Sequence, residues 1–98
     1  MNGDPLRQKV VITNPQGFHM RPMAAFAQLA SRFQSSVKVS REGQSVNGKS
    51  ILDLMLLAAA QGTEVTLEVA GPDAQAALDG LVKLLKTPTE EEASDPSI

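Results

Sequence analysis

The sequence predicts an α+β fold in two layers, in which helices cover one face of an open β-sheet. Between residues 8 and 86, β-rich and helical segments follow one another in the order β-α-β-β-α-β-α, without an internal repeat or a linker. Each helical segment carries an apolar stripe, and one face of a single sheet can cover all three. The length of 98 residues and the hydrophobic fraction of 42% fit one domain with a modest core.

The chain begins with a predicted strand and helix, joined by a short loop. Residues 8–13 (QKVVIT) are rich in β-branched side chains, which is typical of a strand. The loop 14–17 follows. Apolar residues between 26 and 33 then recur at helical spacing, so we expect an amphipathic helix over residues 21–33.

A β-hairpin is predicted next. In residues 37–41, Val37, Val39 and Arg41 lie on one side and Lys38 and Ser40 on the other, which suggests a strand. Residues 42–44 form a turn, and residues 44–47 return as the second strand. The first two strands of the chain are joined by a helical crossover, which favours a parallel arrangement. We therefore expect a gap between them that the last strand fills.

The second helix is predicted to begin after Ser50. The run from Ser50 to Asp53 has the form of a capping box, with Asp in place of the usual Glu or Gln. The helix should extend from residue 51 to about 59, and Gln61-Gly62 should close it.

The last strand and helix complete the pattern. Residues 65–69 alternate strictly and indicate a half-buried strand. Residues 71–73 (GPD) form a turn and a cap, and apolar residues from 74 to 85 give the cleanest helical stripe of the chain. Gly80 lies off that stripe and costs about 1 kcal/mol relative to Ala.

The composition excludes several classes of function. The absence of Cys excludes disulfides and thiolate metal sites, and a single His excludes a multi-histidine metal site. Without Trp or Tyr, the chain has few platforms on which bases could stack, so we expect no nucleic-acid binding. No apolar run approaches a membrane span, and MNGDPLRQK lacks the apolar core of a signal peptide. We therefore expect a cytoplasmic protein without membrane insertion.

The charges divide the chain into a folded part and a tail. The net charge is −2, but residues 87–98 hold four acidic residues and no Lys or Arg. We expect residues 1–7 to be an N-terminal lead, residues 8–86 to be the domain, and residues 87–98 to be an acidic, disordered tail.

Residues 14–22 (NPQGFHMRP) hold the only histidine, His19. Gly17 allows the backbone to turn and to approach a ligand closely. Pro22 suits the first position of a helix, and the residue before it, Arg21, should be pushed out of the helical region. His19 should thus lie just ahead of a helix N-terminus, which favours an anion. With a guanidinium nearby, His19 is a candidate nucleophile toward phosphorus.

Residues 17–22 (GFHMRP) resemble the active-site signature of HPr, the histidine-containing phosphocarrier family of the bacterial phosphoenolpyruvate-dependent phosphotransferase system. Residues 46–51 (VNGKSI), followed by Met55 and Gln61-Gly62, resemble the regulatory-serine segment of that family. The likeness extends over residues 8–86. It implies an HPr-like two-layer open-faced β-sandwich, with a four-stranded antiparallel sheet in the order 1-4-2-3 and three helices on one face.

The resemblance implies a phosphoryl carrier rather than a free-standing enzyme. Phosphorylated enzyme I would transfer its phosphoryl group to Nδ1 of His19, which would pass it to EIIA-type domains in sugar uptake or its regulation. Arg21 would act with His19, and Gly17, Met20 and Pro22 would form the loop that supports the phosphate. The resemblance implies no cofactor and no metal, and we expect a monomer.

Ser50 and the helix after it form a second candidate site. Helix capping alone explains Ser50, and the resemblance implies in addition that HPr kinase/phosphorylase phosphorylates it. The apolar positions after Ser50 span roughly 260°, where a core-facing stripe needs about 100°. The helix is either buried on more sides than usual or exposes an apolar patch. The resemblance favours the patch and implies that Phe18, Ile51, Leu52 and Met55 dock partners.

Three residues depart from the family pattern. Met20 replaces a usual Ala, Ser or Thr, Met23 replaces Ala or Ser, and Asp53 places a carboxylate in the docking surface.

Two other functions stay open. One alternative is an HPr-like regulatory binding protein, controlled by phosphorylation of Ser50, that docks to a transcription regulator or a kinase. The other is a small ligand-binding domain without phosphate chemistry, in which His19 is structural.

Overall fold

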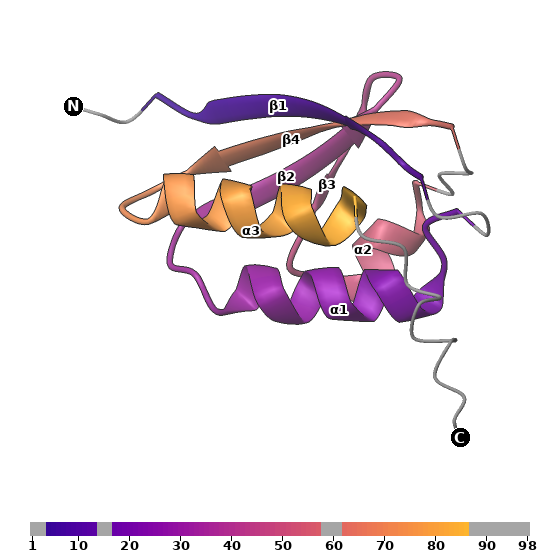
Figure 1. Ribbon diagram of the computed structural model, residues 1–98, viewed down its shortest axis with the longest axis horizontal. Coiled ribbons are helices and arrows are strands. Elements are labelled where there is room, and N and C mark those ends of the chain that lie inside the picture. The colour runs from indigo at the N-terminus through magenta and orange to yellow at the C-terminus, as the bar shows by residue number, and fades with distance from the viewer. Residues whose placement is uncertain (1–3, 14–16, 58–61, 87–98) are drawn as a thin grey trace.

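The computed structural model describes residues 4–13, 17–57 and 62–86, which form a four-stranded sheet and three helices (Figure 1). In chain order the elements are β1 (Leu6–Val11), α1 (Met20–Ser31), β2 (Ser36–Arg41), β3 (Gln44–Asn47), α2 (Ile51–Met55), β4 (Glu64–Ala70) and α3 (Ala74–Lys86). The predicted order of strands and helices is confirmed.

The sheet has the strand order β1-β4-β2-β3, and all of its neighbouring strands are antiparallel. In the middle of β4, Val65 lies opposite Val10 of β1, and Leu67 lies opposite Val39 of β2. Since β4 runs against both neighbours, β1 and β2 are parallel to each other, as the helical crossover between them predicts. The order that the resemblance implied is therefore confirmed.

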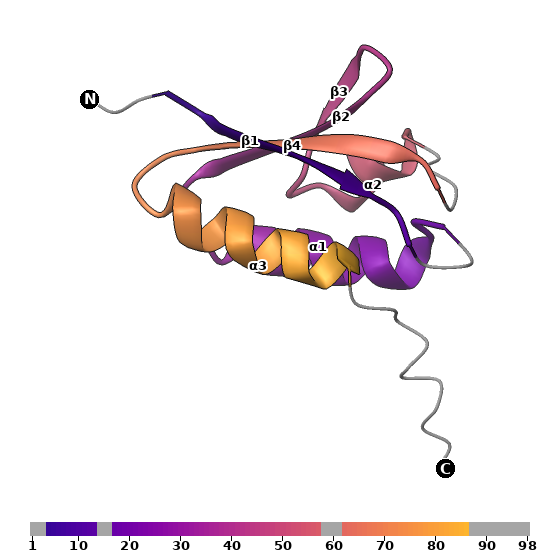
Figure 2. The same ribbon diagram turned by 45° about the horizontal axis from the view of Figure 1, so that its top comes forward.

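The three helices cover one face of the sheet and leave the other face open (Figure 2). Alternate residues of β4 point into the core, where Val65, Leu67 and Val69 are almost completely buried. Phe26 of α1 and Leu81 of α3 belong to the same core cluster and are inaccessible to solvent. The apolar stripes of the helices are thus covered by one sheet face, and the predicted open-faced sandwich is confirmed.

The first strand begins earlier than predicted. β1 spans Leu6–Val11 instead of 8–13, because the ladder with β4 extends to the pair Leu6 and Val69 at the N-terminal end. β1 ends at Val11, although the N–H of the next residue, Ile12, still donates to Thr63 O at 2.9 Å. Pairing with β4 therefore decides this boundary, which local β-propensity alone does not reveal.

Both α1 and α2 end in a tight turn. α1 ends at Ser31 instead of 33, because Arg32 N–H donates to Leu29 O, three residues back. α2 ends at Met55, and Leu56 N–H donates to Asp53 O in the same manner. Such 3₁₀-type bonds commonly close a helix. The predicted end of α2 at about 59 and Gln61 lie outside the described residues.

A buried hydrogen-bonded contact joins the start of β2 to the start of α3. The hydroxyl of Ser35, which is fully buried, donates to Asp73 Oδ1 at 2.6 Å. The N–H groups of Ser35 and Gln34 also donate to the carboxylate, each at 2.9 Å. The bond from the Ser35 hydroxyl, followed by that from Gln34, lowers the pKa of the Asp73 carboxyl below its usual value. The predicted turn at 71–73 thus also anchors a distant segment.

Candidate functional site

His19 is the N-cap residue of α1, as predicted. Its backbone is extended, with φ −96° and ψ −170°, and its carbonyl accepts a helical hydrogen bond from Met23 N–H at 2.9 Å. The side chain makes no capping hydrogen bond to the helix and is partly exposed. The imidazole therefore reaches the surface at the helix end where backbone N–H groups point outward.

α1 begins at Met20, one residue before the start predicted for the helix. Because α1 starts at Met20, Pro22 is its third residue rather than its first, and Arg21 is helical rather than excluded from the helix. The fold tolerates Pro22 there, since N–H groups of the first turn have no acceptor within the helix. Arg21 is exposed, and this first turn contains no acidic residue. The imidazole of His19 and the guanidinium thus belong to one electropositive helix end.

Gly17 and Phe18 fix the segment that leads to His19. Gly17 is buried and has a φ of 76°, in the left-handed region that favours glycine. The ring of Phe18 is only 6% exposed and packs edge-on against Phe26, with 5.8 Å between the ring centroids. Phe18 was predicted to dock partners, but its ring lies in the core. Its contribution to the site is to hold the loop in place.

Ser50 is the N-cap of α2, and its Oγ accepts the N–H of Asp53 at 3.2 Å. This half of the predicted capping box is confirmed. The other half is not formed, because the Asp53 carboxylate accepts the N–H of Asn47 at 3.2 Å, and Ser50 N–H donates to Asn47 O. The side chain of Asp53 therefore fastens the end of β3 to the start of α2.

An apolar patch is exposed on α2 and the turn after it. Its three members, the α2 patch, are Leu52 (75% exposed), Met55 (46%) and Leu56 (62%). On the opposite side, Leu54 and Leu57 are fully buried, and Ile51 packs partly against the core. The wide apolar arc thus produces an exposed surface, and burial on all sides is ruled out. Met20 adds another exposed apolar side chain, directly after His19 (55%).

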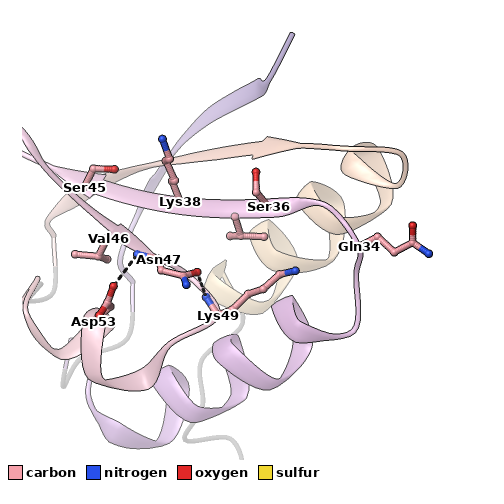
Figure 3. Close-up of a pocket in the computed structure, with 9 residues that line it drawn as sticks. Gln34, Ser36, Lys38, Ser45, Val46, Asn47, Lys49 and Asp53 are labelled. Carbon is pink, nitrogen blue, oxygen red and sulfur yellow. Dashed lines mark hydrogen bonds between the residues drawn. The ribbon is translucent and has the colours of Figure 1, made fainter. Parts of the chain in front are cut away.

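A polar groove beside β3 and α2 was not predicted from the sequence (Figure 3). Lys38, Asn47, Lys49 and Asp53 are among the residues that line it. The Asn47 side chain accepts the N–H of Lys49 at 2.9 Å, and Lys49 Nζ donates to Phe33 O at 2.8 Å. These contacts hold the loop that positions the N-cap of α2. The bond from Lys49 to Phe33 O joins segments that are 16 residues apart in the sequence, so no local motif predicts it.

Residues 4–13, 17–57 and 62–86 contain neither a cluster of metal-ligating side chains nor a membrane-spanning helix. Among these residues, no three His, Cys, Asp or Glu side chains are grouped so that they could hold a metal ion. Within the same ranges, the helices are too short or too polar to cross a membrane.

The sequence matches known proteins over most of its length. Residues 6–87 match the family model described as "PTS HPr component phosphorylation site". The phosphocarrier protein HPr of Cupriavidus necator is 48% identical over 80 residues, which cover 82% of this chain and 90% of the relative. The HPr-like protein Crh of Bacillus subtilis is 47% identical over 76 residues, 78% of this chain and 89% of the relative.

Solved structures of an HPr and of Crh superpose on this chain. The HPr crystal structure from Bacillus anthracis superposes with a TM-score of 0.81 at 33% identity, covering 84% of this chain and 98% of that one. A crystal structure of Crh from Bacillus subtilis, described as a swapped dimer, gives a TM-score of 0.68 at 44% identity, over 83% and 93% of the two chains.

The matched region includes both candidate sites, and the sheet order agrees with the one that the resemblance implied. The helix end that carries His19 is built from the residues that first suggested the resemblance. The chain belongs to the HPr phosphocarrier family of the phosphotransferase system.

Proposed function

We propose that this chain accepts a phosphoryl group from phosphorylated enzyme I on Nδ1 of His19 and passes it to EIIA-type domains, in sugar uptake or its regulation. The observation that carries the proposal is the position of His19. Its partly exposed imidazole precedes a 12-residue helix whose first turn contains Arg21 and no acidic residue. Such a helix end favours a phosphate group.

The chemistry of transfer fits this arrangement. Imidazole side chains are substantially neutral near pH 7 and then act as nucleophiles. A phosphohistidine divides one transfer into two steps, and each step requires positioning and charge stabilisation. The backbone N–H groups of Met20 and Arg21 and the guanidinium are the groups that we assign to the phosphate. Gly17 turns the backbone ahead of His19, and Pro22 lies in the first turn of α1, which carries these groups.

The docking surface that we assign to the partners is the α2 patch together with Ile51. Leu52 and Met55 expose large apolar areas, and isolated apolar patches on small proteins commonly mark interaction sites. α1 and α2 pack against each other, so a partner seated on the α2 patch lies close to the helix that carries His19.

The proposal is tested by incubating the full-length chain with enzyme I and phosphoenolpyruvate. We expect a mass increase of one phosphoryl group that is labile in acid and stable in base. His19→Ala should abolish it, and a label retained by this variant would exclude His19 as the acceptor.

Arg21 is tested separately, with Arg7 as a matched control. Arg7 carries the same charge and is exposed on β1. A charge-assisted hydrogen bond contributes about 1.5–3 kcal/mol, so Arg21→Ala should slow transfer roughly 10- to 100-fold. Arg7→Ala should retain the wild-type rate. Equal rates for both variants would remove Arg21 from the mechanism.

A second candidate function is regulation through Ser50. It is favoured by the exposure of the α2 patch beside this serine and by the 47% identity to Crh. HPr kinase/phosphorylase and ATP should then label the chain, and the label should be lost in Ser50→Ala. Binding of the labelled chain to a transcription regulator would support this role, and a chain that takes no label from the kinase would exclude it.

A further inference from the structure

Methionine supplies nearly all of the readily oxidised side chains of this protein. The sequence contains no Cys, Trp or Tyr and four Met. Thiolates, which otherwise react first with peroxides, are therefore absent. Of the three Met in the described residues, Met20 is 55% exposed and Met55 46%, whereas Met23 is only 8% exposed. Because oxidation follows exposure, Met20 and Met55 are accessible to oxidants and Met23 is protected.

Met20 occupies the more sensitive of the two exposed positions. It is the first residue of α1 and directly follows His19. Oxidation converts the flexible apolar thioether into a polar sulfoxide. At this position the new oxygen carries partial negative charge next to the helix end that we assign to the phosphate. It also replaces an exposed apolar side chain next to His19 with a polar one.

We propose that Met20 is a site of reversible oxidation by hydroperoxides, and that the oxidised chain exchanges phosphoryl groups at His19 more slowly. This effect on transfer rests on the proposed function. In the reaction, a sulfur lone pair attacks the outer peroxide oxygen, an S–O bond forms, and the O–O bond breaks. The hydroperoxide is reduced to an alcohol, or hydrogen peroxide to water, and the sulfur is oxidised by two electrons. Methionine sulfoxide reductase reverses the change.

The site is tested by exposing the full-length chain to hydrogen peroxide and mapping the added oxygen by mass spectrometry of peptides. Met23, three residues away on the same helix, is the internal control. We expect Met20 to be oxidised roughly tenfold faster than Met23, because only the former is exposed. Equal rates at the two positions would overturn the assignment.

The consequence is tested with phosphorylated enzyme I, by comparing each variant with its own unoxidised rate. Oxidised wild type should lose roughly tenfold in transfer rate, the factor that corresponds to about 1.4 kcal/mol. Reductase treatment should restore the rate. The Met55→Leu variant removes the exposed Met of the docking surface, and oxidation should still slow its transfer roughly tenfold. A double variant with Met20→Leu and Met55→Leu should lose little on oxidation, and a double variant as sensitive as Met55→Leu would refute the proposed consequence.

The two proposals fail in distinguishable ways. An unoxidised chain that accepts no phosphoryl group would overturn the proposed function and the effect on transfer with it. The peptide map would still decide whether Met20 is the oxidised residue.

Discussion

Adding one methyl group at Gly48 should destabilise the fold. Gly48 is buried between β3 and α2, and its N–H donates to Val37 O at 2.8 Å. A Cβ at this position would lie 2.6 Å from Val37 Cγ1 and 3.1 Å from Phe26 Cε1. Carbon atoms pack best at about 3.5–4.0 Å, so the methyl group would overlap both side chains. Val37 and Phe26 are themselves buried, which leaves them little room to move.

The magnitude follows from the cost of overpacking. An extra methylene in a well-packed core costs about 1–3 kcal/mol. We expect Gly48→Ala to lie in the upper part of this range, about 2–3 kcal/mol, because the hydrogen bond to Val37 prevents the loop from moving aside. The total stability of a domain is about 5–15 kcal/mol, so the loss is a large fraction of it.

Gly80 provides the matched control with the opposite expected sign. It lies within α3, and a Cβ there would be 3.5 Å from Leu29 Cδ2, an ordinary contact distance. Glycine in the middle of a helix is less stable than alanine by about 0.5–1 kcal/mol. Gly80→Ala should therefore stabilise the protein by that amount, although the chemical change is the same.

Urea unfolding at constant pH, followed by circular dichroism, measures both variants. Gly48→Ala should lower the midpoint and Gly80→Ala should raise it, with the slope unchanged in both. A Gly48→Ala variant as stable as wild type would refute the steric argument. A Gly80→Ala variant that loses as much stability would show that the environment of the glycine does not decide the result.

Three further predictions concern the core, the second helix and pH. Phe26→Ala should lower the free energy of unfolding by about 3–5 kcal/mol, because it leaves a cavity in the core. Ser50→Ala should lower it by about 1 kcal/mol, because the cap of α2 is lost. Urea unfolding measures both variants, and a larger loss for Ser50→Ala than for Phe26→Ala would contradict this order. The pKa of Asp73 is lowered in the folded state, so its carboxylate stabilises the fold above the usual value of 3.8, and this contribution is lost as the pH falls through the lowered pKa. The stability gap between wild type and Asp73→Asn, measured by urea unfolding, should therefore be full near pH 7 and shrink below pH 3.8; a gap independent of pH would refute the linkage.

The spacing of apolar residues was sufficient to predict the helices and strands, because each of them buries the face on which its own apolar residues recur. β4 shows this directly, since Val65, Leu67 and Val69 alternate in the sequence and are buried together in the core. The arrangement of the strands also followed, because a helical crossover between β1 and β2 leaves a place for β4. Boundaries were less predictable, since tertiary pairing decides them. The ladder to β4, for example, extends β1 to Leu6.

The sequence predicted which residues form the candidate site more reliably than it predicted their geometry. The positions of His19 and Ser50 ahead of helices followed from local motifs. The family resemblance implied that Phe18 docks partners, but its ring is only 6% exposed. The direction of the Phe18 ring depends on Phe26 of α1, against which it packs edge-on, and the local sequence around His19 does not reveal this contact. The same holds for Lys49, whose hydrogen bond to Phe33 O joins two distant loops.

Asp53 makes the two helix starts electrostatically different. Its carboxylate and its N–H hold Asn47 and Ser50 in place, so it stabilises the start of α2 before any modification. A phosphate on Ser50 would add a charge of about −1.5 to −2 within the same helical turn as the Asp53 carboxylate, and these two negative charges would repel each other. The first turn of α1 has the opposite character, because it contains Arg21 and no acidic residue. The residue that strengthens the cap of α2 therefore also disfavours phosphate there, and it leaves the helix end at His19 as the more favourable place for a phosphoryl group.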